Sequence, residues 1–571
     1  MLRRRHRVLP ALVLSLALLA AACGDSDADA DADDASASAE SDSTADAGRG
    51  DAATDDTEAS TPDDDEQLSS DGEGSDPATL EPVAGGEIDW AFSDDGTGFD
   101  TTGSIAPGSI RLLSTLNDPL VVIDTNSDWQ PNLAESVVPN DDFTSWTITM
   151  RPGLTFHDGE PIDGEAVRAN LQAIKDSPAV GFALAPVESI SVVDELSARV
   201  DLFVPWAAFP HILANQPGWL VSPSTIGTNE TFVGTGPFML ESWIPNDSAR
   251  VVRNPNYWRA DEGLPYLDAI NIKFLSEATV RRQAFEAGDV RGYHFPGDEG
   301  IVEYLEDDDV DVWISTGGAN EYMWVLNTAV PPFDDVRVRR AMAHAIDQQF
   351  LVDTFRSGLT VPADGPISPS EKWYSPSGYP EFDPDAARAL VDEYEAEVGP
   401  IEFELSISLN PAVVEVAEVM LSFLSDVGID GSLREIGPGQ AIVTLISDDF
   451  QAASWFQFAA PDPDDLYIFF HSSAGALNWS NLVDEDIDAG LDVGRASDDE
   501  ATRGEGYRQF LEALGSAVPI IWVDHLGGVE AVAVIPEIHG IGVPGTLRDG
   551  GEIMPMTHGT RMLWNEIWLE Q

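Results

Sequence analysis

The sequence predicts an α/β protein with two or more lobes, preceded by an export signal and a long acidic segment. Throughout residues 84–571, segments with the periodicity of strands alternate with segments that have the periodicity of helices, which is typical of α/β or α+β proteins. A body of about 490 residues also exceeds what one hydrophobic core usually organises. We therefore expect the 15 Trp and 24 Phe residues to be divided between several cores and a recess between lobes.

The N-terminus has the three parts of a bacterial secretory signal. Residues 1–7 carry four arginines, residues 8–19 are apolar but too few to span a bilayer as a helix, and residues 20–22 are alanines. Cys23, the only cysteine of the chain, follows directly. This pattern resembles a lipobox, whose cysteine is acylated and becomes the first residue of the mature protein, although Ala20 stands where leucine is preferred. The alternative is an ordinary signal peptide (1–22) with an incidental cysteine, and both readings predict export.

Residues 24–83 contain 21 acidic residues and a single basic one, Arg49, among Ala, Ser, Thr and Gly. A segment without apolar periodicity or aromatic residues buries too little surface to offset its ordering entropy, and its like charges extend it. We therefore expect 23–83 to be a lipid-anchored, disordered tether. The remaining body carries 80 acidic and 24 basic residues, which argues against nucleic acid or an anionic membrane surface as partner.

Local patterns predict individual elements of the body. Residues 88–92 are expected to form a first strand, and residues 145–150, in which Trp, Ile and Met alternate with Ser and Thr, a half-buried strand. Asp163 is expected to cap a helix that runs to about residue 174. Residues 336–352 are expected to form one helix with an apolar stripe of Val338, Ala341, Met342, Ala345 and Ile346.

Five groups of short motifs follow one another along the body. They lie at 133–136 with 146–161, 234–238 with 253–258, 327–341, 462–464 and 518–521. In content and order they resemble the extracellular solute-binding proteins of family 5, the peptide, nickel and oligosaccharide receptors of ABC importers. Each motif alone is weak, but five in this order behind a lipobox are specific, and together they cover essentially residues 84–571.

The resemblance implies a two-lobe, type II periplasmic-binding-protein-like fold. Lobe I would comprise 84–322, with an extra subdomain inserted at about 110–235, and a C-terminal return at 530–571. Lobe II would comprise 323–529. Such proteins close around a ligand between the lobes and present it to an ABC permease, so we expect a monomeric receptor, anchored by lipid to the outer face of the cell membrane.

Several motif residues have structural interpretations. Gly234 and Gly236 are expected to adopt backbone conformations closed to other residues, and Asp158-Gly159 to form a turn. His157 lies inside a scaffold motif of the family, so it is expected to be a structural histidine rather than a metal ligand.

The ligand is less constrained by the sequence. In peptide-binding members, a carboxylate three residues before the Asp-Pro motif pairs with the peptide ammonium, and Ala459 occupies that position here. Because an unpaired buried charge is costly, this argues against peptides with a free amino terminus, unless a shift lets Asp462 or Asp464 serve. Aromatic and amide residues near this motif and at the hinge are predicted to bind the ligand: Tyr322, Trp324, Trp455, Phe458, Asn478, Trp479 and Asn481. Aromatic faces suit sugars and apolar side chains alike, so a sugar, a modified or cyclic peptide and an opine-like solute remain open.

Other function classes have little support in the sequence. The chain has no Gly-x-Ser-x-Gly elbow, no His-Glu-x-x-His and no phosphate loop, so we expect no enzyme and no cofactor. Its nine histidines show no clustered spacing, so no metal site is predicted. A nickel-type chelate receptor, and a ligand sensor not coupled to transport, are the alternatives.

Overall fold

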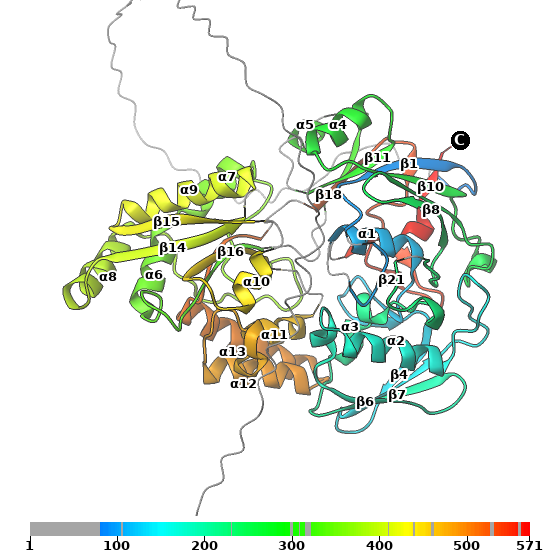
Figure 1. The fold of residues 1–571 in the computed structure, drawn as a ribbon, viewed down its shortest axis with the longest axis horizontal. Helices are drawn as coiled ribbons and strands as arrows, with labels where there is room; N and C mark the ends of the chain where they lie inside the picture. Colours follow the sequence, from blue (N-terminus) through cyan, green and yellow to red (C-terminus); the bar gives the residue numbers. More distant parts are fainter. Residues whose placement is uncertain are drawn as a thin grey trace, which may run out of the picture. The chain divides into compact units, whose positions relative to one another are not determined.

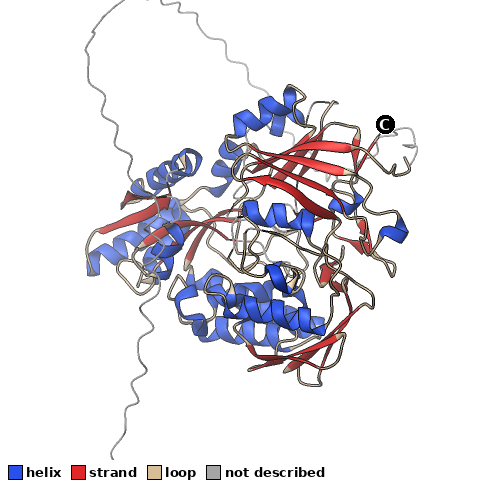
Figure 2. Ribbon diagram, turned by 45° about the vertical axis from the view of Figure 1, so that its right-hand side comes forward, coloured by secondary structure: helices blue, strands red, loops and turns tan. Residues whose placement is uncertain are grey.

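The computed structural model describes residues 80–570 except 97, 104–106, 230, 297–300, 306, 308, 315–320, 409, 438–439, 458–461, 526–529 and 558–560. The predicted signal, Cys23 and nearly all of the tether lie outside the described residues. The chain divides into two compact units, and the described residues fall in the second, Ala78–Gln571. Within this unit the larger sheets have seven, five and four strands (Figures 1 and 2).

The seven-stranded sheet contains the strand predicted at 88–92, which is confirmed as β1. The strand order is β12 (Asp311–Ile314), β18 (Glu530–Val534), β11 (Gly292–Pro296), β1 (Glu87–Phe92), β10 (Ala269–Phe274), β9 (Ser248–Arg253) and β8 (Phe238–Ile244). Strand β1 runs parallel to both of its neighbours. Its Trp90 packs edge-on against Trp564, with ring centroids 5.3 Å apart, in a core that also holds leucines of α1 (Pro107–Leu116).

A second core on the opposite face of that sheet contains aromatic residues from α4 (Ala278–Glu286), β11 and α5 (Ile301–Tyr304). Phe285 contacts Tyr293 and Tyr304 there. Short strand pairs complete this part of the chain: β2 (Val121–Ile123) with β3 (Trp129–Pro131), β19 (Ile538–His539) with β24 (Trp568–Leu569), β20 (Gly545–Thr546) with β21 (Glu552–Ile553), and β22 (Met556–Thr557) with β23 (Arg561–Met562).

The four-stranded antiparallel sheet has a core of its own. Its order is β4 (Ala134–Pro139), β5 (Ser145–Met150), β7 (Ser197–Leu202) and β6 (Val187–Val192). Strand β5 is the strand predicted at 145–150, with Trp146, Ile148 and Met150 buried. The predicted helix is confirmed as α2 (Gly164–Asp176), whose cap Asp163 accepts a 2.8 Å hydrogen bond from the Ala166 amide. Its buried Val167, Leu171 and Ile174 pack into this core (Figure 1).

The five-stranded sheet lies among most of the helices. Its order is β15 (Ile429–Ile436), β14 (Ile401–Ser408), β16 (Ala452–Gln457), β13 (Glu321–Leu326) and β17 (Ile520–Asp524). Strand β13 is antiparallel to both neighbours, whereas β14 is parallel to both of its own. The accompanying helices are α6 (Val336–Ala345), α7 (Gln348–Phe355), α8 (Pro384–Glu397), α9 (Pro411–Ser425), α10 (Ala441–Ile446), α11 (Tyr467–Phe470), α12 (Glu485–Ala496) and α13 (Glu500–Ala517).

The prediction of one helix over 336–352 is wrong, because α6 ends at Ala345 and α7 begins at Gln348. Ile346 between them is extended, and Asp347 caps α7 by accepting a hydrogen bond from the Phe350 amide. The Gln348 side chain donates to the Ala363 and Trp522 carbonyls. These tertiary bonds fix the start of the second helix at the break. The predicted apolar stripe is nevertheless buried throughout.

The chain passes from the seven-stranded to the five-stranded sheet between β12 and β13, and returns between β17 and β18. Strands β13–β17 are therefore contiguous in sequence and enclosed by these two crossings. No helix in the described part of the chain is long and apolar enough to cross a membrane.

His157 is confirmed as a structural histidine, because it connects two of the sequence motifs. The Gly234 amide donates to its Nδ1 at 3.1 Å, and its Nε2 donates to the Gly236 carbonyl at 3.2 Å. Burial lowers the pKa of His157 to about 4, so the ring is neutral. The glycines are required for space rather than for an unusual φ, which corrects the sequence interpretation: a Cβ on either would lie 2.4 Å from a backbone atom of Leu116.

Candidate ligand-binding site

Three of the predicted ligand-binding residues lie on adjacent central strands of the five-stranded sheet. Strands β13 and β16 pair Tyr322 with Phe456 and Met323 with Trp455. Because directly opposed residues of an antiparallel pair point to the same face, Tyr322 and Trp324 share one face, and Met323 and Trp455 share the other. The predicted aromatic residues are thus divided between the two faces.

Tyr322 and Trp324 are enclosed by protein, with 1% and 0% of their surface exposed. The Trp324 Nε1 and the Ser454 hydroxyl each donate a 3.2 Å hydrogen bond to the Tyr322 hydroxyl. The Trp324 ring lies 6.5 Å from that of Phe403. Both side chains belong to the core of this sheet in the structure, and their contact with a ligand stays a prediction.

Trp455 and Trp479 contact each other on the opposite face. Their ring centroids are 5.2 Å apart in an edge-to-face arrangement, and Trp479 also packs on Phe469 at 5.0 Å. Trp479 is 4% exposed, whereas Trp455 is half-buried. The structure therefore brings these two predicted residues together, with Trp455 the more accessible.

The predicted amides Asn478 and Asn481 hold the loop around Trp479. Asn478 donates to the Leu482 carbonyl at 2.7 Å and accepts from the Ser480 hydroxyl at 3.0 Å. The Asn481 amide donates to side-chain oxygens of Asn327 and Asp448. These bonds occupy much of their hydrogen-bonding capacity, so a ligand role for them stays a prediction. Phe458 lies outside the described residues.

Asp462 and Asp464, considered above as possible partners of a ligand ammonium, are already paired with arginines. The Arg503 guanidinium donates to both carboxylate oxygens of Asp462, at 2.6 and 2.7 Å. Arg495 donates to both carboxylate oxygens of Asp464 through two different nitrogens, Nε at 2.7 Å and Nη2 at 3.1 Å. Burial favours protonation of Asp462, but the His211 and Arg503 charges outweigh it and lower its pKa. The motif therefore forms internal ion pairs, and that alternative is not supported.

The same two aspartates contact the segment that contains the short helix α3 (Phe209–Ile212). Trp206 Nε1 donates to Asp464 at 2.5 Å, and His211 Nε2 lies 3.4 Å from Asp462. The Ala207 amide donates to the Arg495 carbonyl at 2.8 Å. The Asp-Pro-Asp motif thus joins elements of the five-stranded sheet region to residues near the four-stranded sheet.

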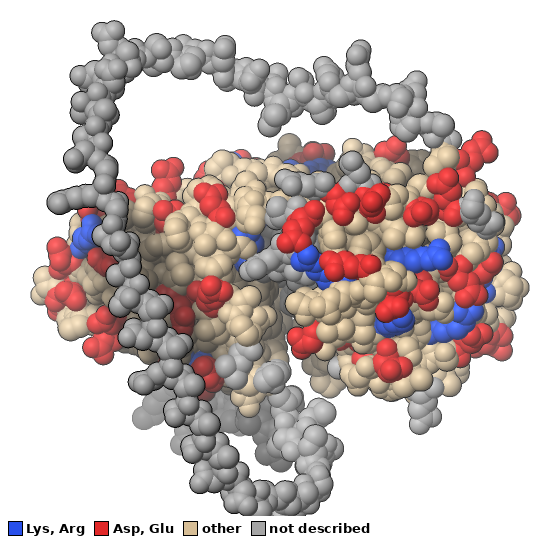
Figure 3. Space-filling view, turned by 90° about the horizontal axis from the view of Figure 1, so that it is seen from above, with Lys and Arg blue, Asp and Glu red and all other residues tan. Residues whose placement is uncertain are grey.

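Arg495 extends this contact by stacking. Its guanidinium lies 3.5 Å from the Tyr467 ring centroid and 5.2 Å from that of Trp206. Sequence reasoning missed Arg495 and Arg503, since both lie in helices far along the chain from the motif. One signal in the sequence could have found them: the chain has only 29 Lys and Arg residues against 101 Asp and Glu residues, so each arginine has many possible acidic partners. Acidic side chains also outnumber basic ones on the face of the molecule shown in Figure 3.

A buried Glu–His pair lies at the strand ends that flank the two crossings. Glu321 begins β13 and His525 follows β17; they are 1% and 2% exposed, and Glu321 Oε1 lies 3.6 Å from His525 Nδ1. Burial, reinforced by the charge of Glu371, raises the pKa of Glu321 well above its ordinary value. Burial also lowers the pKa of His525 to about 4 and raises that of Glu371 to about 7. Sequence reasoning selected Tyr322 and passed over its neighbour Glu321.

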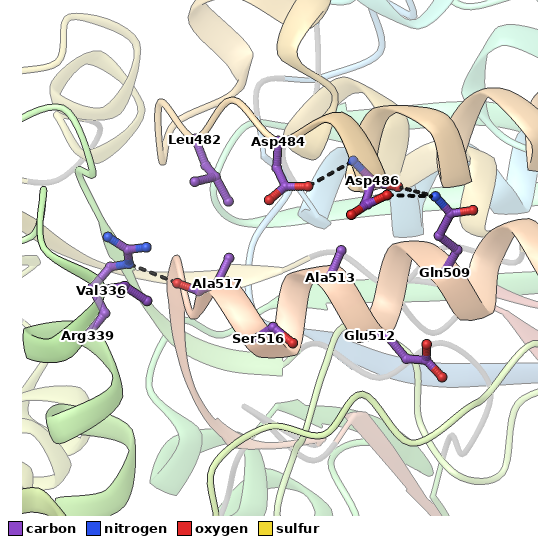
Figure 4. Close-up of a pocket in the computed structure, with 10 residues that line it drawn as sticks. All are labelled: Val336, Arg339, Leu482, Asp484, Asp486, Gln509, Glu512, Ala513, Ser516 and Ala517. Atoms are coloured by element: carbon purple, nitrogen blue, oxygen red, sulfur yellow. Dashed lines mark hydrogen bonds between the residues drawn. The ribbon is translucent and has the colours of Figure 1, made fainter.

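A hollow of about 660 Å³ lies elsewhere, between α6, α12 and α13 (Figure 4). Its polar groups serve the local structure: Arg339 donates to the Ala517 and Phe333 carbonyls, and Asp484 caps α12. Burial lowers the pKa of Arg339 to about 10. We therefore assign this hollow no ligand. Nor do the described residues include a group of three or more His, Cys, Asp or Glu side chains placed to hold a metal ion.

Two large sheets joined by two chain crossings, with a further sheet inserted in the first, give the chain a two-lobe α/β architecture. The family model described as bacterial extracellular solute-binding proteins, family 5, matches residues 128–478. The chain belongs to this family, as its sequence motifs predict.

Curated relatives bind different solutes. The glutathione-binding protein GsiB of Salmonella paratyphi A is 29% identical over 318 residues, which cover 54% of this chain and 61% of that protein. The chain thus aligns with about three fifths of the length of these relatives. The nickel-binding periplasmic protein of Escherichia coli K12 is 26% identical over 447 residues, or 72% of this chain and 83% of that protein.

The fold has solved counterparts. The binding protein DppA from Helicobacter pylori, in complex with the peptide STSA, superposes with a TM-score of 0.72 at 20% identity, over 86% of this chain and 99% of that one. This similarity confirms the predicted two-lobe fold of the family.

Proposed function

We propose that this protein is the solute-binding component of an ABC importer. It captures a peptide-like or oligosaccharide-like solute between lobe I (84–322 and 530–571) and lobe II (323–529), and it delivers the solute to a membrane permease. The observation that carries the proposal is the pair of crossings between the two large sheets. Chain connections between two bodies commonly serve as the hinge about which the bodies close on a ligand.

The solutes that related proteins bind favour a peptide-like solute for this protein. GsiB is a glutathione-binding protein and DppA holds a tetrapeptide, so two peptide binders share the family or fold of this chain. The half-buried Trp455 provides an aromatic surface of the kind that packs on apolar side chains or sugar rings. We propose no catalytic step, because the family consists of receptors.

A metal-chelate receptor is the second candidate function. Its support is the nickel-binding relative, which aligns over more of this chain than GsiB does. A sensor that binds the same solutes without a transporter would have the same binding behaviour, and uptake assays in cells that lack the gene separate the two.

Calorimetry with solutes of each class tests the proposal. Glutathione, dipeptides and tetrapeptides, oligosaccharides, opines and a nickel–histidine chelate are titrated into the purified protein. Saturable one-to-one binding of a peptide or oligosaccharide supports the main proposal, and binding of the chelate alone supports the second. Failure of every class would contradict both.

We further propose that the exported protein is a monomer and is held at the membrane by a diacylated Cys23. The support is the lipobox-like context of this single cysteine. Mass spectrometry of the membrane fraction should detect diacylglycerol-modified Cys23 as the N-terminal residue. A soluble mature protein that begins at another residue would overturn the lipid anchor while leaving the receptor function intact.

A further inference from the structure

A buried acid and a buried histidine, which flank the two crossings, lie side by side with several polar atoms that lack a hydrogen-bond partner among the described residues. Among the residues that the structure describes, the Glu321 Oε2 and both ring nitrogens of His525 have no hydrogen-bond partner, and the Glu321 Oε1 lies 3.6 Å from the His525 Nδ1. Buried polar groups in native proteins are nearly always satisfied, and each unsatisfied group costs free energy. Such a cost at the hinge of a receptor indicates a partner that arrives with the ligand.

The surroundings of this pair are acidic. Glu371, whose carboxylate accepts a 2.6 Å bond from the Ser368 amide, acts electrostatically on Glu321. The cation nearby, Arg356, is engaged by Asp524 at 3.3 Å. No ion pair in the described part of the chain joins a Lys or Arg to Glu321 or Glu371. An incoming positive charge would therefore meet acids that no internal cation neutralises.

An aromatic ring lies on the same face of the sheet. Glu321 opposes Gln457 and Met323 opposes Trp455, so Glu321 and Trp455 occupy successive positions on one face of the β13–β16 ladder. Trp455 is half-buried. An indole face attracts organic cations through its quadrupole, and it complements the carboxylate beside it.

We infer that Glu321, with His525 and Glu371 around it and Trp455 beside it, is the subsite of the receptor that binds a cationic group of the solute, an ammonium or a guanidinium. The inference rests on the proposed receptor function and narrows its solute class. The N–H groups of the cation donate to Glu321 Oε2 and to the unprotonated nitrogen of His525, neither of which has a hydrogen-bond partner among the described residues.

Binding at this subsite is coupled to a proton. Burial raises the pKa of Glu321 and so favours its protonated form in the free protein, with Glu371 and Asp524 acting in the same direction. The neutral ring of His525 adds no charge, and Arg356 is held by Asp524. When the cation arrives, the O–H bond of Glu321 breaks, the proton passes to the buffer and the carboxylate forms N–H···O bonds. The affinity for a cation should therefore rise with pH until Glu321 is ionised in the free protein.

Calorimetry of the full-length protein with matched probe pairs tests the subsite. Glycyl-phenylalanine amide and its N-acetyl form differ in the ammonium; N-acetyl-arginine amide and N-acetyl-citrulline amide differ in the guanidinium. We expect the wild type to bind at least one charged member about tenfold more tightly than its neutral counterpart. The probe pair that shows this difference identifies the cationic group, ammonium or guanidinium, that the subsite binds. Glu321→Gln should weaken that charged probe at least about thirtyfold, in line with loss of one partner from a buried charge pair, and leave the neutral probe unchanged.

Two readouts separate this role from a structural one. Glu321→Gln is isosteric and removes a buried acid, so the melting temperature without probe should not fall. In the wild type the binding enthalpy should differ between phosphate and Tris buffers because one proton is released, and this requires no variant. Glu418→Gln replaces an exposed acid in α9 and is the matched control. It should change neither the melting temperature nor the dependence of the binding enthalpy on the buffer.

Equal binding of charged and neutral probes, or an unchanged affinity in Glu321→Gln, would overturn the subsite. Failure of both charged probes on the wild type would overturn it too. The receptor function would survive either result if a neutral solute or a chelate binds in the class titrations above.

Discussion

The two tryptophans on one face of the five-stranded sheet differ in burial, and this difference predicts different consequences of removing them. Trp479 is enclosed between Trp455 and Phe469. Trp479→Ala should therefore lower the free energy of unfolding by about 3–5 kcal/mol. Trp455 keeps an accessible side, so Trp455→Ala should lower stability less and weaken solute binding by about 1–3 kcal/mol.

Thermal melting and calorimetry on the same two variants check this prediction. A Trp479→Ala protein with wild-type stability and lost affinity would show that Trp479 is a ligand contact rather than a core residue. Wild-type affinity in Trp455→Ala would remove Trp455 from the site.

Glu371 makes the stability depend on pH near neutrality. Burial raises its pKa to about 7 from an ordinary value of 4.5, so the folded state holds a proton that the unfolded state loses at lower pH. The contribution of Glu371 to the free energy of unfolding is therefore fully present below about pH 4.5 and is lost as the pH rises through 7. Glu371→Gln should be more stable than the wild type by about 1–3 kcal/mol at pH 8 and equal to it at pH 4.

Denaturant titrations of the ligand-free protein at both pH values measure this difference. Glu418→Gln is again the control, since it lies on the exposed side of α9. A constant difference between Glu371→Gln and the wild type across the pH range would contradict the assigned proton.

At the scale of elements, the ion pair of Asp464 with Arg495 joins α12 to the short 3-10 helix Pro463–Leu466 and to Trp206. Asp464→Asn leaves Arg495 buried without a counter-charge, which should cost about 3–5 kcal/mol of stability. Asp549→Asn, which removes an exposed pair with Arg151, is the matched control and should cost about 0–1 kcal/mol. Equal melting temperatures for the two variants would show that the buried pair adds nothing beyond a surface pair.

Elements with a strong local pattern are predictable from the sequence. Strand β5 and helix α2 follow their alternation and their Asp163 cap. The break between α6 and α7 is not predictable in this way, because it depends on hydrogen bonds from the Gln348 side chain to two carbonyls that are distant in sequence. The candidate site is predictable to a similar extent. The sequence selects Trp455 and Trp479 near the motif, and the structure brings them into contact, while their role in binding stays a prediction. The pairing of Glu321 with His525 depends on strand ends far apart in sequence meeting in space.

At the scale of the whole molecule, the acidic tether should be dispensable for binding. Residues 24–83 carry no aromatic side chain and little apolar surface to pack on the body. A protein that lacks them should bind its solute with unchanged affinity by calorimetry. A loss of more than about tenfold, or about 1.4 kcal/mol, would show that the segment takes part in binding.

As a receptor, the protein should close its two lobes on a solute about the crossings near Glu321 and His525. A ligand moves such an equilibrium only if it binds the closed state better. Small-angle scattering of the protein without residues 24–83, recorded with and without a saturating solute identified by calorimetry, measures this closure directly. We expect a smaller radius of gyration with solute. An unchanged scattering profile, with binding confirmed by calorimetry, would show that the lobes do not close.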